Sequence, residues 1–102
     1  MFFPVCIDIE NKKCLVIGGG KIAYKKIKTL SRYNSDITVI AEEIKEEKIR
    51  EIGNIDIREK RFSGENLREY MLVVAATDDK ELNEEIAEFC IENNILVNNV
   101  TS

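Results

Sequence analysis

The sequence predicts an α/β fold in which helices cover both faces of a doubly wound parallel sheet. Short apolar runs alternate with segments of helical spacing along most of the 102 residues, which is typical of strand–helix–strand units. Three successive glycines, Gly18 to Gly20, join the first strongly apolar run to the first helical segment. With right-handed crossovers, the core strands take the order 3-2-1-4-5.

The amino-terminal half is assigned from its apolar spacing. Residues 5–9 alternate weakly before a polar turn, which predicts a short N-terminal hairpin strand that leads into a core strand at 14–17. Residues 20–33 have apolar side chains at helical spacing, with lysine and arginine on the solvent-facing side. A β-branched run at 36–41 predicts a parallel strand, and residues 42–52 return to helical spacing.

The carboxyl-terminal half repeats this pattern. Residues 55–60 alternate apolar and charged side chains, as expected of a half-exposed edge strand. After a short helix, the apolar run at 71–76 predicts a central strand that is buried on both faces. Asp78 is followed three residues later by Glu81, which is a helix-capping pattern, and a last strand is expected at 95–100.

The composition limits the function. A chain of this length forms one domain, and 44% hydrophobic with 33% charged residues is typical of a globular protein outside the membrane. The amino terminus does not have the pattern of a signal peptide, so a cytoplasmic location is expected. A net charge of −4 disfavours nucleic acid as a partner. Histidine is absent, and the odd, widely spaced Cys6, Cys14 and Cys90 predict reduced core thiols rather than a disulfide framework or a metal site.

The glycine-rich turn carries most of the functional information. It follows a predicted strand, opens a predicted helix and fits the pattern G-x-G-x-x-(G/A) through Gly18, Gly20 and Ala23. Gly18 allows the tight turn, Gly20 lets a pyrophosphate approach the backbone, and Ala23 lets helix and strand pack closely. Lys21 lies where phosphate is expected, although an exposed lysine is also ordinary at the start of a helix. The turn therefore predicts a Rossmann-type dinucleotide site, with the helix amides facing the phosphates.

The second strand ends where the adenosine ribose of a dinucleotide would lie. The acid expected at this point is replaced by Ala41, and Glu42 and Glu43 follow directly. These glutamates either contact the ribose or are acids favoured by the dipole of the following helix. Two acids without an arginine disfavour the extra phosphate of NADP, so NAD is the expected cofactor.

The fourth strand ends beside the expected nicotinamide half of the cofactor. Ala76, Thr77 and Asp78 lie at this edge, because the carboxyl ends of parallel strands share one side of the sheet. Asp78 contacts the ligand, caps the next helix, or does both.

Taken together, these residues resemble the NAD-binding domain at the amino terminus of siroheme synthases and precorrin-2 dehydrogenases. The resemblance covers nearly the whole chain. It rests on Phe-Pro-Val at 3–5 with Asp8, Cys-Leu-Val-Ile-Gly-Gly-Gly at 14–20, Ala23 with Lys26, Ile-Thr-Val at 37–39, Ala-Ala-Thr-Asp-Asp at 75–79 with Leu82 and Asn83, and Ile-Leu-Val-Asn at 95–98. This combination at these separations is far more specific than the glycines alone.

The resemblance implies NAD-dependent oxidation of precorrin-2 to sirohydrochlorin, and in many members also the insertion of ferrous iron. Hydride transfer depends on holding a nicotinamide ring against the tetrapyrrole, which suits a chain without histidine. The residues that would contact NAD are Gly18, Gly19, Gly20, Lys21 and Ile22, then Glu42 and Glu43, and then Ala76 and Thr77.

The chain departs from the family pattern in two ways. Members usually have an aspartate after the last strand that is assigned to catalysis, and Thr101 stands at this position. A threonine hydroxyl is a poor general base near neutral pH, so either Asp78 or Asp79 substitutes or the chemistry differs. Members also continue into a helical region that dimerises and completes the tetrapyrrole pocket. Residues 1–102 are therefore expected to be a cofactor-binding fragment of a homodimeric protein.

A regulatory nucleotide-binding module without chemistry is the alternative function. Such modules usually have an acid at the end of the second strand, so Ala41 disfavours this interpretation. Thr101 in place of the catalytic acid favours it.

Overall fold

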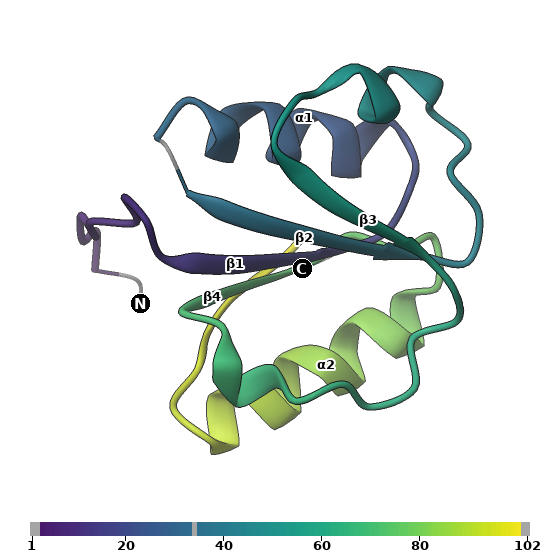
Figure 1. The fold of residues 1–102 in the computed structure, drawn as a ribbon. Helices are drawn as coiled ribbons and strands as arrows, with labels where there is room; N and C mark the ends of the chain where they lie inside the picture. The colour runs from purple at the N-terminus through teal and green to yellow at the C-terminus, as the bar shows by residue number, and fades with distance from the viewer. Residues whose placement is uncertain (1–2, 34, 101–102) are drawn as a thin grey trace.

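The structure is a computed structural model that describes residues 3–33 and 35–100, and these form a five-stranded sheet between helices (Figure 1). The strands are β1 (Lys13–Ile17), β2 (Asp36–Ala41), β3 (Ile55–Glu59), β4 (Leu72–Ala75) and β5 (Leu96–Asn99). Their order is β3-β2-β1-β4-β5, and every pairing is parallel. The predicted Rossmann-type doubly wound sheet is therefore confirmed.

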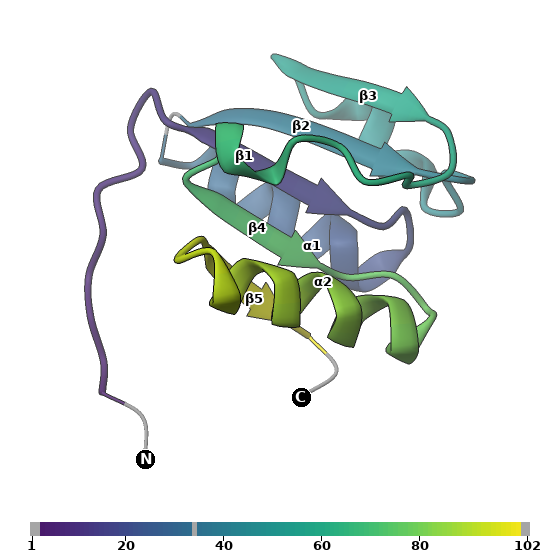
Figure 2. The ribbon, with the colours of Figure 1, turned by 90° about the horizontal axis from the view of Figure 1, so that it is seen from below.

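Helices cover the two faces of the sheet. Helix α1 (Lys21–Ser31) lies on one face and α2 (Lys80–Glu92) on the other (Figure 1, Figure 2). Two 3-10 helices, η1 (Glu47–Glu51) and η2 (Leu67–Glu69), lie in the connections before and after β3. In the described part of the chain, no helix has the length and apolar character needed to cross a membrane.

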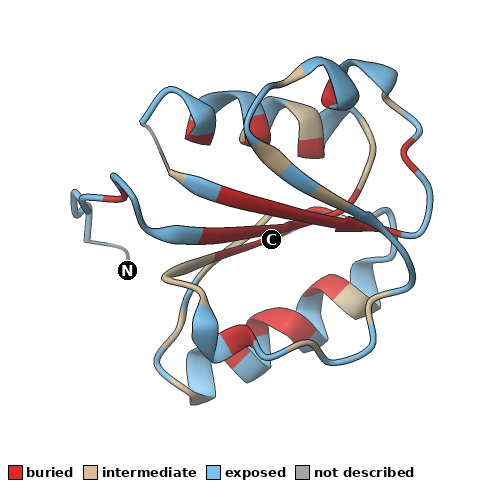
Figure 3. Cartoon of the chain, in the orientation of Figure 1, coloured by how far each residue is buried: buried red, intermediate tan, exposed pale blue. Residues whose placement is uncertain are grey.

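Two apolar cores follow from the two-residue period of the strands. In β1, Cys14 and Val16 pack into the core beneath α1, whereas Leu15 and Ile17 pack into the core beneath α2. Figure 3 shows the buried positions concentrated in the central strands and on the inward faces of both helices. Strand β3 has exposed charged residues at alternate positions, as predicted for an edge strand.

The predicted N-terminal hairpin strand is wrong, because residues 5–9, all of which the structure describes, form no strand. Strand β1 pairs with β2 on one side and with β4 on the other, so no edge of β1 is left for an antiparallel neighbour. The segment instead runs along the outside of the domain (Figure 2), with Val5 72% exposed and only Ile9 in the core. The prediction of a core thiol is wrong for Cys6, which is exposed for the same reason, and is confirmed for Cys14 and Cys90, which are buried.

The predicted helix at residues 42–52 is also wrong, since this segment forms only the 3-10 helix η1. The N–H groups of Lys45 and Glu46 donate to the carbonyl oxygen of Gly19, at 2.9 and 3.0 Å, so the backbone before η1 follows the glycine turn rather than a helical path. Ile44 and Ile49 are nevertheless buried. The apolar spacing therefore predicted which side chains face the core but not the backbone between them.

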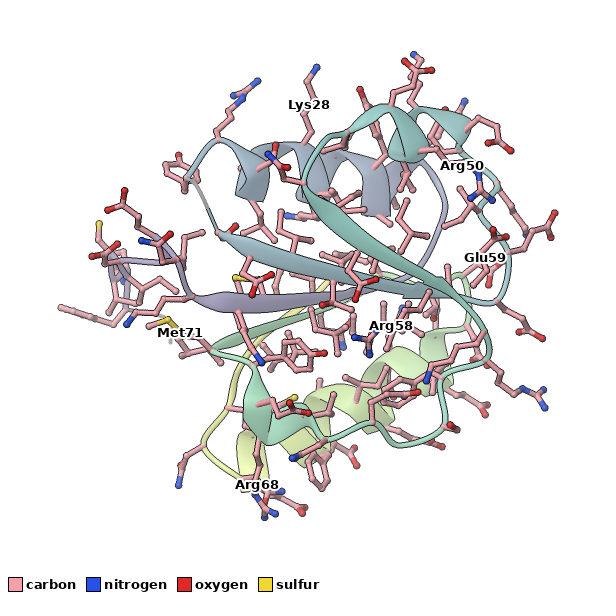
Figure 4. All side chains as sticks on the ribbon, in the orientation of Figure 1. Lys28, Arg50, Arg58, Glu59, Arg68 and Met71 are labelled. Atoms are coloured by element: carbon pink, nitrogen blue, oxygen red, sulfur yellow. The ribbon has the colours of Figure 1, made fainter. Side chains whose placement is uncertain are left out.

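Ion pairs attach η1 to the end of β3. The guanidinium of Arg50 binds the carboxylates of Glu47 and Glu59, and Figure 4 shows Arg50 and Glu59 on neighbouring segments. The hydrogen bond from Arg50 lowers the pKa of Glu59. Both side chains are solvent-exposed, so the pair fixes a position more than it stabilises the fold.

Candidate functional site

A cavity of about 1180 Å³ lies at the carboxyl edge of the sheet. Its walls come from the glycine turn, the loops after β2, β3 and β4, and the first turns of α2. The predicted cofactor-binding residues that line it are Gly18, Gly19, Gly20, Lys21, Ile22, Glu42, Glu43, Ala76, Thr77 and Asp78. The lining also includes residues outside the predicted cofactor-binding set, among them Lys45, Arg61, Phe62, Leu82 and Glu85.

The three glycines of the turn have three different surroundings. A Cβ atom on Gly18 would lie 2.2 Å from the carbonyl oxygen of Ala76, and the φ angle of +139° is one that L side chains rarely adopt. A Cβ on Gly19 would lie 2.4 Å from the carbonyl oxygen of Glu43. A Cβ on Gly20 would meet nothing within 4 Å. The first two glycines are therefore required by the packing of the protein itself, whereas Gly20 borders open space.

The first turn of α1 presents backbone donors beside this open space. Among the described residues, no side chain caps α1, and its first turn contains no acid. The first N–H groups of a helix have no partner within the helix, so those of α1 are available to an anion. Ala23 lies in the core beneath α1 with none of its surface exposed, so it has the predicted packing role and does not line the cavity.

A buried amide holds the loop after β4. The side chain of Asn83 is fully buried, its Oδ1 accepts the N–H of Thr77 at 3.0 Å, and its Nδ2 donates to the carbonyl oxygen of Thr77 at 3.0 Å. The Thr77 hydroxyl lies 2.6 Å from the same Oδ1. From the sequence, Asn83 stood out only as part of a family pattern. An amide on the apolar side of a predicted helix is the signal that would have singled it out.

The residue that caps α2 is Asp79, so the predicted capping role of Asp78 is wrong. The Oδ1 of Asp79 accepts the N–H groups of Glu81 and Leu82 at 3.0 and 3.2 Å. The Thr77–Asn83 bonds set this register, because they fix the backbone directly before the helix. Asp78 is 87% exposed and lies 3.3 Å from the ammonium of Lys45.

The remaining candidate chemical groups lie away from the cavity or outside the described residues. Burial raises the pKa of the Cys14 and Cys90 thiols, and neither lines the cavity. Thr101, which stands where the family has an aspartate, lies outside the described residues. Within residues 3–33 and 35–100, no three His, Cys, Asp or Glu side chains are grouped so that they could hold a metal ion.

Known proteins resemble the chain in sequence and in structure. Siroheme synthase of Ruthia magnifica subsp. Calyptogena magnifica is 40% identical over 103 residues, which is 99% of this chain and 22% of that protein. Siroheme synthase of Mannheimia succiniciproducens is 39% identical over 99 residues, which is 95% of this chain and 21% of that protein. The solved structure of SirC, a precorrin-2 dehydrogenase, superposes with a TM-score of 0.83 at 30% identity, over 99% of this chain and 50% of that chain.

The chain spans about a fifth of the length of these siroheme synthases and half of SirC. Residues 5–102 match the model of a protein family described as "Putative NAD(P)-binding". That match includes the glycine turn, both loops that border it and all five strands. The chain therefore belongs to this NAD(P)-binding family.

Proposed function

We propose that this chain is the NAD-binding domain of a precorrin-2 dehydrogenase, which oxidises precorrin-2 to sirohydrochlorin. The observation that carries the proposal is the open space at Gly20, beside free helix donors, in a turn whose other two glycines are packed against the protein. The substrate is supported by the names of the relatives, siroheme synthase and precorrin-2 dehydrogenase.

The residues of the cavity fit a dinucleotide. Its volume of about 1180 Å³ exceeds the roughly 300–1000 Å³ of sites for drug-sized ligands, as a larger ligand requires. The backbone at Gly20, Lys21 and Ile22 would bind the diphosphate. Glu42 and Glu43, after β2, would lie at the adenosine ribose, and the Ala76–Thr77 loop at the nicotinamide half. The bound cofactor supplies the hydride acceptor.

NAD rather than NADP is the proposed cofactor. Glu42 and Glu43 are both exposed and both line the cavity next to the end of β2. Carboxylates at this position accept hydrogen bonds from the ribose hydroxyl groups and repel a 2′-phosphate. A lower affinity for NADP⁺ than for NAD⁺ is therefore expected, and a titration with each nucleotide measures it.

Precorrin-2 loses a hydride and a proton in the oxidation, so the reaction also needs a proton acceptor. Asp78 is the proposed acceptor, because its exposed carboxylate lines the cavity at the nicotinamide side. The chain's own part in the reaction is then to bind and orient the two reactants and to receive this proton.

Binding is tested by titration calorimetry with NAD⁺ on the wild type and on Gly20→Val. The added side chain fills the space where the diphosphate would lie, so we expect binding to be lost while the fold is kept. Gly53→Val is the matched control, since a Cβ at Gly53 also meets nothing within 4 Å and Gly53 does not line the cavity. Equal NAD⁺ affinity in wild type and Gly20→Val would contradict the proposed site.

Catalysis is tested separately, by following NADH formation from precorrin-2 and NAD⁺ under anaerobic conditions. NADH formed in step with sirohydrochlorin supports a dehydrogenase. A chain that binds NAD⁺ but leaves precorrin-2 unchanged acts as a binding module when alone. The insertion of ferrous iron, the homodimer and the cytoplasmic location stay predictions from the sequence.

A further inference from the structure

A lysine side chain connects the two loops that border the glycine turn. The ammonium of Lys45, in the loop after β2, lies 3.3 Å from the Oδ2 of Asp78, in the loop after β4. Both residues line the cavity. The two loops are separated by more than thirty residues in sequence, so the contact depends entirely on the tertiary structure.

Each of these loops is held against a different glycine of the turn. The N–H of Lys45 donates to the carbonyl oxygen of Gly19 at 2.9 Å, which fixes the backbone of Lys45 beside the turn. On the other side, the carbonyl oxygen of Ala76 occupies the space where Gly18 would have a Cβ. The side chain of Lys45 therefore starts next to the turn and extends toward the β4 side.

The ion pair with Asp78 is a weak one. The side chains are 61% and 87% exposed, and exposed pairs contribute little because water screens them. A diphosphate brings two negative charges and several acceptor oxygens to the same cavity, and it would bind an ammonium more strongly than one solvated carboxylate does. Lys45 is therefore free to exchange its partner at little cost.

We infer that Lys45 is a phosphate-binding residue of the cofactor site, which releases Asp78 and binds the diphosphate when the dinucleotide enters. This inference rests on the proposed function. The movement of Lys45 then has two effects. Its ammonium binds the diphosphate, and the carboxylate of Asp78 is left free beside the nicotinamide half. Lys45 adds charge where the backbone of the glycine turn offers only N–H groups.

The test is a double-mutant cycle with Lys45→Met and Asp78→Asn, read by titration calorimetry with NAD⁺. Loss of one charge-assisted contact should weaken binding about five- to tenfold in Lys45→Met. Asp78→Asn removes the competing carboxylate, so it should strengthen binding roughly two- to threefold. In the Lys45→Met background the gain from Asp78→Asn should be smaller, because no lysine is left to be released.

Two variants with the same charge changes serve as controls. Lys48→Met removes an exposed lysine of η1, and Asp56→Asn removes an exposed carboxylate of β3, and neither residue lines the cavity. Both should leave the NAD⁺ affinity within about twofold of wild type, since the charges lie outside the site and salt screens them. Far-ultraviolet circular dichroism checks that all variants fold.

Binding of ADP and adenosine separates a phosphate contact from any other effect. Lys45→Met should weaken ADP, which has the diphosphate, and leave adenosine unchanged. If the wild type binds NAD⁺ and Lys45→Met binds it with the same affinity, the inference is overturned while the proposed function stands. An equal loss of ADP and adenosine in that variant would overturn the inference as well. A wild type that binds no NAD⁺ would overturn both the inference and the proposed function.

Discussion

Single residues at the cavity divide into those that the fold needs and those that a ligand would need. Gly18 and Gly19 are packed against carbonyl oxygens of neighbouring loops, so their lack of a side chain serves the protein. Gly20 has no such neighbour. The glycine pattern assigned Gly18 to the turn and Gly20 to the pyrophosphate, but it gave no role to Gly19, whose packing against Glu43 depends on a distant loop.

Asn83 is the buried residue on which the loop after β4 depends, and Asn83→Leu tests this. Leucine has a similar size but cannot bind the N–H and carbonyl groups of Thr77, which would lose these partners at a part-buried position. We expect the free energy of unfolding to fall by about 1–3 kcal/mol. Urea denaturation followed by circular dichroism measures the change.

The same variant should weaken NAD⁺ binding, since Thr77 lines the cavity. Glu84→Leu is the control, because Glu84 is the next residue of α2 and is exposed. Asn83→Leu with the stability of the wild type would show that the amide does not hold the loop.

At the scale of elements, the ends of helices and strands place the functional groups. Helix α1 begins at the glycine turn without a side-chain cap, whereas α2 begins with an aspartate that binds two of its first N–H groups. Two of the first donors of α2 are therefore taken by the protein, whereas those of α1 remain for a ligand. This difference explains why one of two similar helix starts is the candidate phosphate site.

The capping role of Asp79 predicts different effects for two neighbouring aspartates. Asp79→Ala removes the acceptor for the N–H groups of Glu81 and Leu82, so the free energy of unfolding should fall by about 0.5–2 kcal/mol. Asp78→Ala should change stability by less than about 0.5 kcal/mol, because it breaks only an exposed ion pair. Thermal or urea denaturation of both variants gives the comparison, and the reverse order would contradict the assigned cap.

At the scale of the whole molecule, the sheet separates two cores and both contain a buried thiol. Cys14 lies in the core beneath α1 and Cys90 in the core beneath α2. Burial disfavours the thiolate, so the pKa of each is raised from its ordinary value of 9.0. In the unfolded chain these thiols ionise at a lower pH than in the folded chain. Their contribution to stability is therefore complete below about pH 9, and it is lost as the pH rises through the raised pKa of the folded chain.

We therefore expect the free energy of unfolding to decrease as the pH rises above about 9. The free energy of unfolding of Cys90→Ala should decrease less steeply over the same range, because one of the two thiols with a raised pKa is removed. Urea denaturation at a series of pH values measures both slopes. Cys6→Ala is the control for the substitution itself, since it removes an exposed thiol instead of a buried one. Parallel slopes for wild type and Cys90→Ala would show that the buried thiol makes no contribution.

The sequence by itself determined the order of the five core strands and the position of the glycine turn. These features depend on local periodicity and on the handedness of crossovers, which operate within one strand–helix–strand unit. The β1 strand, the turn after it and α1 could be predicted for this reason. Nearly all the predicted cofactor-binding residues also meet in one cavity, because parallel strands end at a common edge.

Only the tertiary structure decided the parts that depend on contacts between distant segments. Pairing of β1 on both sides excluded the hairpin strand, and bonds from Lys45 and Glu46 to Gly19 replaced a helix by η1. The bonds between Thr77 and Asn83 moved the cap of α2 by one residue. Lys45 and Asp78 meet for the same reason. Such contacts join residues that no local pattern relates, so they follow from the folded backbone and not from spacing along the chain.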